Sequence, residues 1–218
     1  MKKRTGIFGG TFDPIHSGHL RVAEEVRELF DLDKMIFIPA YIQPLKDAHA
    51  AACAKHRLEM ARQAVADNPY FEVNDCEVRR EGPSYTVDTL DQIQSTCPKA
   101  RLYFLLGSDA WLNITLWHDY MRLFESAELV VMSRPGYNVA PPDEVLPLEA
   151  AGSLCYDGER YAYPSGGGVR FAQVTWLDIS GTLIRKKCKE GKSIKYLVHP
   201  AVEEYIRREK LYAASPEQ

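Results

Sequence analysis

The chain has 218 residues, of which 45% are hydrophobic and 26% are charged, and its formal net charge at pH 7 is −3. This composition is near the average for globular proteins, and it excludes disorder, collagen or coiled coil as the main architecture. A charge so close to neutral excludes a bulk binder of nucleic acid or of an anionic membrane, so any phosphate site must be local.

Short apolar runs alternate with helical patterns along the chain. In order, the predicted elements are strand 5–9, helix 17–30, strand 34–39, helix 55–67, strand 71–74, helix 86–95, strands 101–107, 128–133 and 169–176, and helices 182–189 and 200–212. Strands 101–107 and 128–133 are continuously apolar, as expected when both faces of a sheet are covered. Ser17 is the predicted N-cap of the first helix.

The alternation predicts βαβ units and therefore an α/β fold. We expect one doubly wound, Rossmann-like domain over residues 1–218, with a mostly parallel sheet and C-terminal helices; the helical part 179–212 carries a second phosphate motif. Residues 137–168 are rich in proline and glycine and are predicted to form a long irregular loop. In such folds ligands bind at the carboxyl ends of the strands, where the strand order reverses.

Three sequence features bear on where the protein is located: the length of its apolar runs, its first residues and its cysteines. Apolar runs fall short of the ~20 residues that a membrane helix needs, and the start MKKRTGIFGG turns to glycine before an apolar run develops. We therefore expect neither a membrane span nor a signal peptide. The five cysteines are odd in number and never form C-x-x-C, which predicts free thiols in a reducing cytoplasm.

The first segment with chemistry is Gly9–His19 (GGTFDPIHSGH), between the first strand and the first helix. Glycines allow close approach of a ligand to the backbone, and a helix start offers free N–H groups to an anion. His16 and His19 add donors, which suits a polyphosphate whose charge grows in a transition state. The string is neither a Walker A loop nor a dinucleotide fingerprint. A tight turn with two surface histidines and a zinc pair are the alternatives.

The second segment is Asp178–Arg185 (DISGTLIR), between the last strand and a helix. Ser180 and Thr182 can cap that helix, whose N-terminus is again an anion site. Arg185 lies on its first turn, where a guanidinium can bind phosphate oxygens in a forked geometry. Taken alone, the segment also fits an ordinary capped helix with a solvated arginine.

Together, GTFDPIHSGHL and ISGTLIR resemble the nucleotidylyltransferase superfamily, whose H-x-G-H motif is related to that of class I aminoacyl-tRNA synthetases. Five further features resemble bacterial nicotinate-nucleotide adenylyltransferases: HRLEMARQAV (56–65), GPSYTVDTL (82–90), FLLGSD (104–109), Trp117 and SRPG (133–136). The resemblance runs from Gly6 to Tyr212. It implies transfer of AMP from ATP to nicotinate mononucleotide, by in-line attack of the 5′-phosphate on the α-phosphorus without a covalent intermediate.

The resemblance implies roles for particular residues. It assigns His16, His19 and Arg185 as catalytic, because they would hold the phosphates and the developing charge. Contacts to ATP or its phosphates are implied for Gly9, Gly10, Thr11, Phe12, Lys46, Ser180 and Thr182. Magnesium is expected on the ATP phosphates, and no metal-binding residue is named because Mg²⁺ usually keeps several waters.

The base end of the mononucleotide is implied to lie against a second group of residues: Tyr85, Thr86, Asp109, Trp117 and His118. Trp117 would stack on the pyridine ring, and main-chain N–H groups of Tyr85-Thr86 and Trp117-His118 would meet the carboxylate. Core packing is the alternative for Trp117. Asp109 would bind ribose or a metal-bound water, or else serve as a helix N-cap.

The chain departs from the family pattern at two positions. Leu45 stands where the family usually has histidine, and Gly181 where it usually has serine. Leu45 either borders the phosphate site beside Lys46 or packs into the core. Alternative functions are a sister adenylyltransferase acting on nicotinamide mononucleotide or phosphopantetheine, a tRNA-charging module, and a non-catalytic nucleotide sensor. The sequence leaves the oligomeric state open, a homo-oligomer included.

Overall fold

The computed structural model describes residues 3–45, 50–133, 136 and 139–214. Within these residues one eight-stranded sheet has the order β3-β2-β1-β4-β5-β8-β7-β6. Its strands are β1 (Arg4–Gly10), β2 (Lys34–Pro39), β3 (Phe71–Val73), β4 (Arg101–Gly107), β5 (Glu128–Ser133), β6 (Cys155–Tyr156), β7 (Tyr161–Ala162) and β8 (Gly168–Gln173). Neighbours from β3 through to β8 pair in parallel, whereas β7 pairs antiparallel with β8 and with β6. The predicted α/β fold with a mostly parallel sheet is confirmed.

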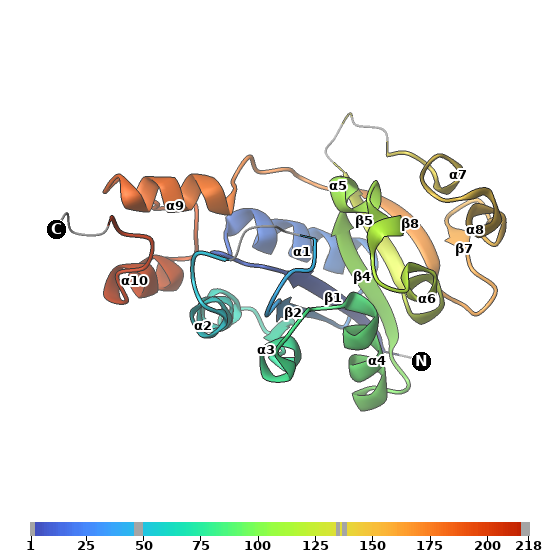
Figure 1. Ribbon diagram of the computed structural model, residues 1–218, viewed down its shortest axis with the longest axis horizontal. Coiled ribbons are helices and arrows are strands. Elements are labelled where there is room, and N and C mark those ends of the chain that lie inside the picture. The colour runs from blue at the N-terminus through green and yellow to red at the C-terminus, as the bar shows by residue number, and fades with distance from the viewer. Residues whose placement is uncertain (1–2, 46–49, 134–135, 137–138, 215–218) are drawn as a thin grey trace.

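Helices cover both faces of this sheet (Figure 1). They are α1 (Ser17–Leu29), α2 (Ala54–Val65), α3 (Cys76–Arg80), α4 (Thr86–Thr96), α5 (Ser108–Trp111), α6 (Tyr120–Ser126), α7 (Pro142–Val145), α8 (Leu148–Gly152), α9 (Gly181–Lys189) and α10 (Pro200–Arg208), with a 3₁₀ turn, η1, at Ile114–Leu116. In Figure 1, α9 and α10 lie at one end of the molecule and α7 and α8 at the other. None of the described helices is long and apolar enough to cross a bilayer.

The strands alternate their side chains between two hydrophobic clusters. Phe8 and Phe37 point to the face covered by α1, α2, α9 and α10, whereas Ile7 and Ile36 point to the face covered by α4, α5 and α6. Both sets are buried, because helices lie on both sides. This explains why the strand sequences are continuously apolar rather than alternating.

The order of the strands places the predicted site. The chain progresses outward from β1 through β2 to β3, and outward in the other direction from β4 to β5 and β8. The order therefore reverses between β1 and β4, whose carboxyl ends are Gly10 and Gly107. Residues 11–19 follow β1 directly, so the first motif lies at the reversal point where α/β folds bind ligands.

The prediction of an irregular loop over residues 137–168 is wrong for the part that the structure describes. Helices α7 and α8 and the hairpin β6–β7 form there, and the hairpin extends the sheet beyond β8. Pro142 occupies the first turn of α7, and the indole Nε1 of Trp111 donates to the carbonyl of Ala140 at 2.8 Å. Elements of two to five residues are too short to show a periodicity in sequence.

Predicted boundaries also change, most of all at the ends of two elements. The strand predicted over 169–176 ends at Gln173, because its neighbour β5 ends at the paired Ser133. The helix predicted over 200–212 ends at Arg208, and Lys210 then adopts a left-handed backbone with φ 52° that no helix continues through. The short helices α3, α5 and α6 were not predicted.

Candidate active site

The two histidines of the first motif lie at the start of α1. His16 is the N-cap residue, with an extended backbone, and its N–H donates to Nδ1 of His19 at 3.2 Å. The prediction that Ser17 caps this helix is wrong. Ser17 is the first helical residue, and both its N–H and its hydroxyl donate to carbonyls of the C-terminal segment, those of Leu197 and Tyr196.

The rings of His16 and His19 stack, with centroids 3.6 Å apart. Since Nδ1 of His19 accepts a hydrogen bond, the neutral ring carries its proton on Nε2. The alternative of two surface histidines is wrong for His16, which is buried. Burial lowers the pKa of His16 to about 4, so this ring is neutral near pH 7. The pair can thus donate hydrogen bonds to an anion without requiring two adjacent positive charges.

Gly18, which lies between the two histidines, permits this stacking of their rings. A Cβ atom on Gly18 would lie 3.1 Å from Nδ1 of His16, a distance tighter than most real contacts. Phe12 supports the pair from the other side: its buried ring meets the His19 ring edge-on, with centroids 5.1 Å apart. Phe12 can therefore contact a phosphate only through its backbone, as can Gly9 and Gly10 at the end of β1.

The second motif packs directly against the first. Ser180 caps α9 by accepting a hydrogen bond from the N–H of Leu183 at 3.2 Å, as predicted. Thr182 instead accepts from Nη2 of Arg185 at 3.1 Å, while Nη1 of Arg185 donates to the carbonyl of Asp13 at 2.6 Å. The two segments that sequence analysis singled out are therefore neighbours in space.

Gly181 explains how closely the two motifs approach. A Cβ atom at this position would lie 2.7 Å from the carbonyl oxygen of Asp13 and 3.1 Å from Nη1 of Arg185. The first distance is shorter than real Cβ contacts allow, and the oxygen belongs to backbone. The absence of the usual serine is thus matched to the present spacing of the two segments.

Two site residues were missed by sequence reasoning. The Asp13 carboxylate accepts from the N–H groups of Ala51 and Ala52 at 2.7 and 3.2 Å and from the Tyr212 hydroxyl at 2.6 Å, and it lies 3.7 Å from Nη1 of Arg185. Arg57 is fully buried and donates to three carbonyls, those of Thr11, Tyr41 and Ala52. Both residues stand inside quoted motifs, but only the contacts show what they hold.

The charges here favour an anion. Burial lowers the pKa of the Arg57 guanidinium, and the negative charge of Asp13 opposes this shift. An arginine remains protonated in proteins. Where the two motifs meet, two guanidinium groups, those of Arg57 and Arg185, therefore lie near the single carboxylate of Asp13.

The loop after β2 approaches the first motif. The hydroxyl of Thr11 donates to Oε1 of Gln43 at 3.2 Å. Lys46, the predicted phosphate contact, lies outside the described residues. Leu45 is 50% exposed, so the alternative in which it packs into the core is wrong.

The residues predicted for the base end gather on the neighbouring loops. Tyr85 precedes α4 and His118 follows η1, and their rings lie 4.4 Å apart between centroids with a tilt of 33°. Trp117 is half-buried and meets the ring of Phe104 on β4 edge-on, with centroids 6.0 Å apart. One edge of Trp117 is thus fixed by the core while part of the indole stays accessible.

The main-chain donors predicted for the carboxylate are fewer than expected. The N–H of Tyr85 donates to Pro83 and that of Trp117 donates to Ile114. Thr86, the first residue of α4, and His118 have no such backbone acceptor among the described residues. Of the main-chain donors predicted to meet the carboxylate, the N–H groups of Thr86 and His118 are therefore the two that are available.

Asp109 lies at the carboxyl end of β4, on the first turn of α5, with an exposed side chain. Its alternative role as a helix N-cap is wrong, because Gly107 occupies that position. One carboxylate oxygen of Asp109 would lie 2.5 Å from a Cβ on Gly107, so the carboxylate folds back over the end of the strand. The exposed side chain can meet a ribose hydroxyl or a metal-bound water.

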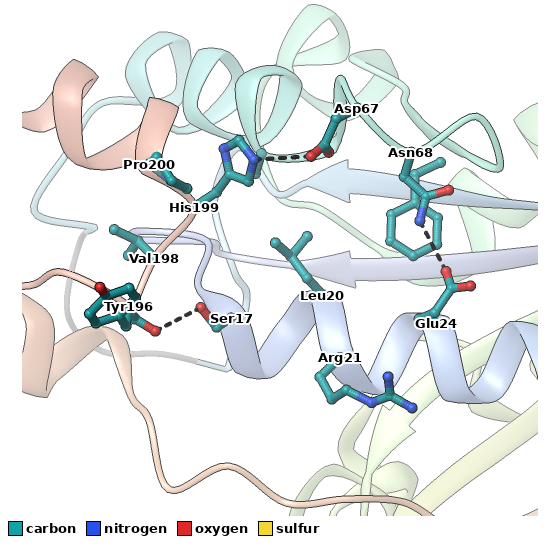
Figure 2. Close-up of a pocket in the computed structure, with 12 residues that line it drawn as sticks. Ser17, Leu20, Arg21, Glu24, Asp67, Asn68, Tyr196, Val198, His199 and Pro200 are labelled. Atoms are coloured by element: carbon teal, nitrogen blue, oxygen red, sulfur yellow. Dashed lines mark hydrogen bonds and ion pairs between the residues drawn. The ribbon is translucent and has the colours of Figure 1, made fainter.

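A cavity of about 470 Å³ lies between α1, the end of α2 and the segment before α10 (Figure 2). Figure 2 shows Ser17, Leu20 and Glu24 on one wall, with His199 facing Asp67 at 3.3 Å across the opening. None of the predicted phosphate- or base-binding residues lines it. The cavity marks where the segment before α10 rests on the start of α1.

Comparisons with known proteins agree with this geometry. A family model described as cytidylyltransferase-like matches residues 7–187. The chain is 43% identical to a probable nicotinate-nucleotide adenylyltransferase of Citrifermentans bemidjiense over 96% of this chain and 98% of that protein. It is 44% identical to one of Syntrophotalea carbinolica over 96% and 97%. A solved structure of Plasmodium falciparum nicotinic acid mononucleotide adenylyltransferase complexed with NaAD has the same fold, with a TM-score of 0.72, 21% identity, and coverage of 96% and 97%.

Proposed function

The chain belongs to the cytidylyltransferase-like family and, within it, to the nicotinate-nucleotide adenylyltransferases; from this premise we propose that it transfers the AMP moiety of ATP to nicotinate mononucleotide. The products are deamido-NAD and pyrophosphate, in a step of NAD biosynthesis. The five free cysteines fit the cytoplasmic location that the sequence predicts.

The observation that carries this proposal is the junction of the two motifs. Arg185 donates to the backbone of Asp13, beside the stacked histidines and at the point where the strand order reverses. Two helix N-termini, those of α1 and α9, meet there. Helix starts and the guanidinium of Arg185 together favour a polyphosphate over a neutral ligand.

The roles of the residues follow from what their donors can reach. Nε2–H of His19 and the neutral His16 ring stabilise the charge that develops on the phosphates during in-line attack. Arg185 uses two N–H groups on Asp13 and Thr182, and a guanidinium has five, so others can bind the departing pyrophosphate. Ser180, Thr182, Thr11 and the predicted Lys46 complete the phosphate cradle. No protein side chain needs to form a covalent bond, because nucleotidyl transfer depends on positioning and charge stabilisation.

A divalent metal, Mg²⁺, fits this site through the substrate more than through the protein. No group of three or more histidine, cysteine or acidic residues that could hold a metal occurs in the described parts of the chain. The Asp13 carboxylate accepts three hydrogen bonds and lies beside Arg185, whereas Asp109 has an exposed carboxylate that could contact a metal-bound water. Bound to the ATP phosphates, the metal would neutralise part of their charge.

The nicotinate end is bound by the second group of residues. The accessible part of Trp117 can stack on the pyridine ring, and Tyr85 and His118 form an aromatic wall beside it. The N–H groups of Thr86 and His118 can donate to the ring carboxylate. An amide has one carbonyl oxygen that can accept from one of these N–H groups, but its NH₂ group would face the other and leave that donor without an acceptor.

The test is release of pyrophosphate from ATP with nicotinate mononucleotide, nicotinamide mononucleotide or phosphopantetheine as acceptor. We expect kcat/KM for nicotinate mononucleotide to exceed that for nicotinamide mononucleotide by at least ~10²-fold, since a site built for one hydrogen-bonding group rejects its mismatch strongly. Equal values for the two mononucleotides would refute the substrate preference but leave adenylyl transfer standing. If the folded protein released no pyrophosphate with any of the three acceptors, the proposed function itself would be refuted.

A further inference from the structure

The segment after α10 returns to the first motif. After α10 ends at Arg208, Lys210 and Tyr212 both adopt left-handed backbones, with φ of 52° and 59°. This region is sparsely populated for residues other than glycine, so the surroundings must hold the turn in place. The result is that the Tyr212 hydroxyl donates to Oδ1 of Asp13 at 2.6 Å, across 199 positions of sequence.

The other contacts of Asp13 show what this hydroxyl controls. Oδ1 also accepts from the N–H of Ala52, and Oδ2 accepts from the N–H of Ala51 and faces Nη1 of Arg185 at 3.7 Å. The same Nη1 donates to the backbone carbonyl of Asp13 at 2.6 Å. Rotation of the carboxylate would therefore change both the charge and the space beside the Arg185 guanidinium.

The hydroxyl is suited to hold a carboxylate under all working conditions. Burial and the negative charge of Asp13 raise the pKa of Tyr212 far above its usual range. The phenol therefore remains a hydrogen-bond donor and does not compete as an anion with the phosphates.

We propose that Tyr212 is a positioning residue for adenylyl transfer, which fixes the Asp13 carboxylate and through it holds Arg185 toward the phosphates of ATP. This inference rests on the proposed role of Arg185. It assigns a part in the reaction to a residue that lies beyond the last helix and outside both motifs.

The alternative is that Tyr212 only docks the C-terminal segment. Tyr205 on α10 offers a matched comparison, because its hydroxyl pairs with Nδ1 of His56 at 2.9 Å and it too is packed into the hydrophobic cluster under α1 and α2. Both tyrosines contribute to docking. Only the hydroxyl of Tyr212 contacts the first motif.

The experiment compares Tyr212→Phe with Tyr205→Phe, each of which removes one hydroxyl and keeps the ring. Thermal unfolding first establishes that both variants are folded. We expect kcat/KM for ATP to fall about tenfold in Tyr212→Phe, the scale of one hydrogen bond to a charged group, with KM for nicotinate mononucleotide within about twofold of wild type. Tyr205→Phe should stay within about twofold for both substrates. Equal losses in the two variants would overturn the proposal.

A double-mutant cycle tests whether Tyr212 acts through Arg185. In an Arg185→Ala background, Tyr212→Phe should cost less than about twofold in kcat/KM, because the group that it positions is gone. The same tenfold loss in both backgrounds would overturn the proposal. If Tyr212→Phe does not fold, Asp13→Asn tests the same connection, because Asp13 lies between Tyr212 and Arg185. An unchanged kcat/KM for ATP in that variant would likewise overturn the proposal. Wild-type activity reports separately on the proposed function.

Discussion

Two buried carboxylates, Asp13 and Glu128, each join segments that are distant in sequence, and they lie at opposite ends of the strands. Asp13 follows the carboxyl end of β1, and Glu128 is the first residue of β5. Asp13 is held mainly by uncharged donors, two backbone N–H groups and a hydroxyl. Glu128 is fully buried and pairs with three arginines: Arg101, Arg160 and Arg170.

The difference lies in what each carboxylate leaves available. Neutral donors hold the Asp13 carboxylate in place, and Arg185 directs one nitrogen, Nη1, both to this carboxylate and to the carbonyl of the same residue, so it keeps other N–H groups for a ligand. The three arginines around Glu128 point inward to one carboxylate, and one of them, Arg160, belongs to the hairpin that extends the sheet. The first arrangement presents a cation at the site, whereas the second uses its ion pairs to fasten a peripheral hairpin.

The largest expected effect is on stability at the Glu128 end. Glu128→Gln leaves three arginines without their buried counter-charge, and breaking such a cluster by removing one partner costs about 3–5 kcal/mol of unfolding free energy. Glu159→Gln is the matched control, because Glu159 is exposed and also pairs with Arg170; it should cost no more than about 1 kcal/mol. Urea unfolding measures both. Equal stabilities of the two variants would contradict the structural role given to Glu128.

The next effect is on catalysis at the Asp13 end. His16→Ala and His19→Ala should each lower kcat by roughly 10²–10³, the usual loss for one charge-stabilising donor. His19 is half-buried, so its variant should unfold within about 1 kcal/mol of wild type, whereas the buried His16 should cost more. Steady-state kinetics compares kcat of each variant, once it is shown to be folded, with that of wild type. A folded variant with near wild-type kcat would remove that histidine from the mechanism.

The elements that sequence predicted well are those whose signal is local. Helix 17–30 has an apolar stripe long enough to show the helical period, and strands such as 101–107 are continuously apolar. Ser180 caps α9, as its residue type suggests. The joining of the two motifs could also be predicted, because parallel strands bring their carboxyl ends to one edge.

What could not be predicted depends on contacts between distant segments. Arg57 has a charge that in a helical pattern indicates a solvated face, yet it is buried because three loop carbonyls surround it. Tyr212 meets Asp13 only because two left-handed residues turn the chain back. His16 caps α1 instead of Ser17 because the C-terminal segment binds the Ser17 donors. None of these contacts leaves a periodic pattern.

The smallest expected effects come from restoring the two residues in which the chain departs from its family, and they differ in sign. Gly181→Ser places a Cβ 2.7 Å from the Asp13 carbonyl, so the two motifs must move apart at a cost of about 1–3 kcal/mol, with a raised KM for ATP. Leu45→His places an imidazole at a half-exposed position, so stability should stay within about 0.5 kcal/mol and activity should be equal or higher. Each variant controls for the other in melts and kinetics. If Gly181→Ser were neutral while Leu45→His lowered the melting temperature, the close approach of the motifs would not be needed for the site, and the loop after β2 would be packed rather than open.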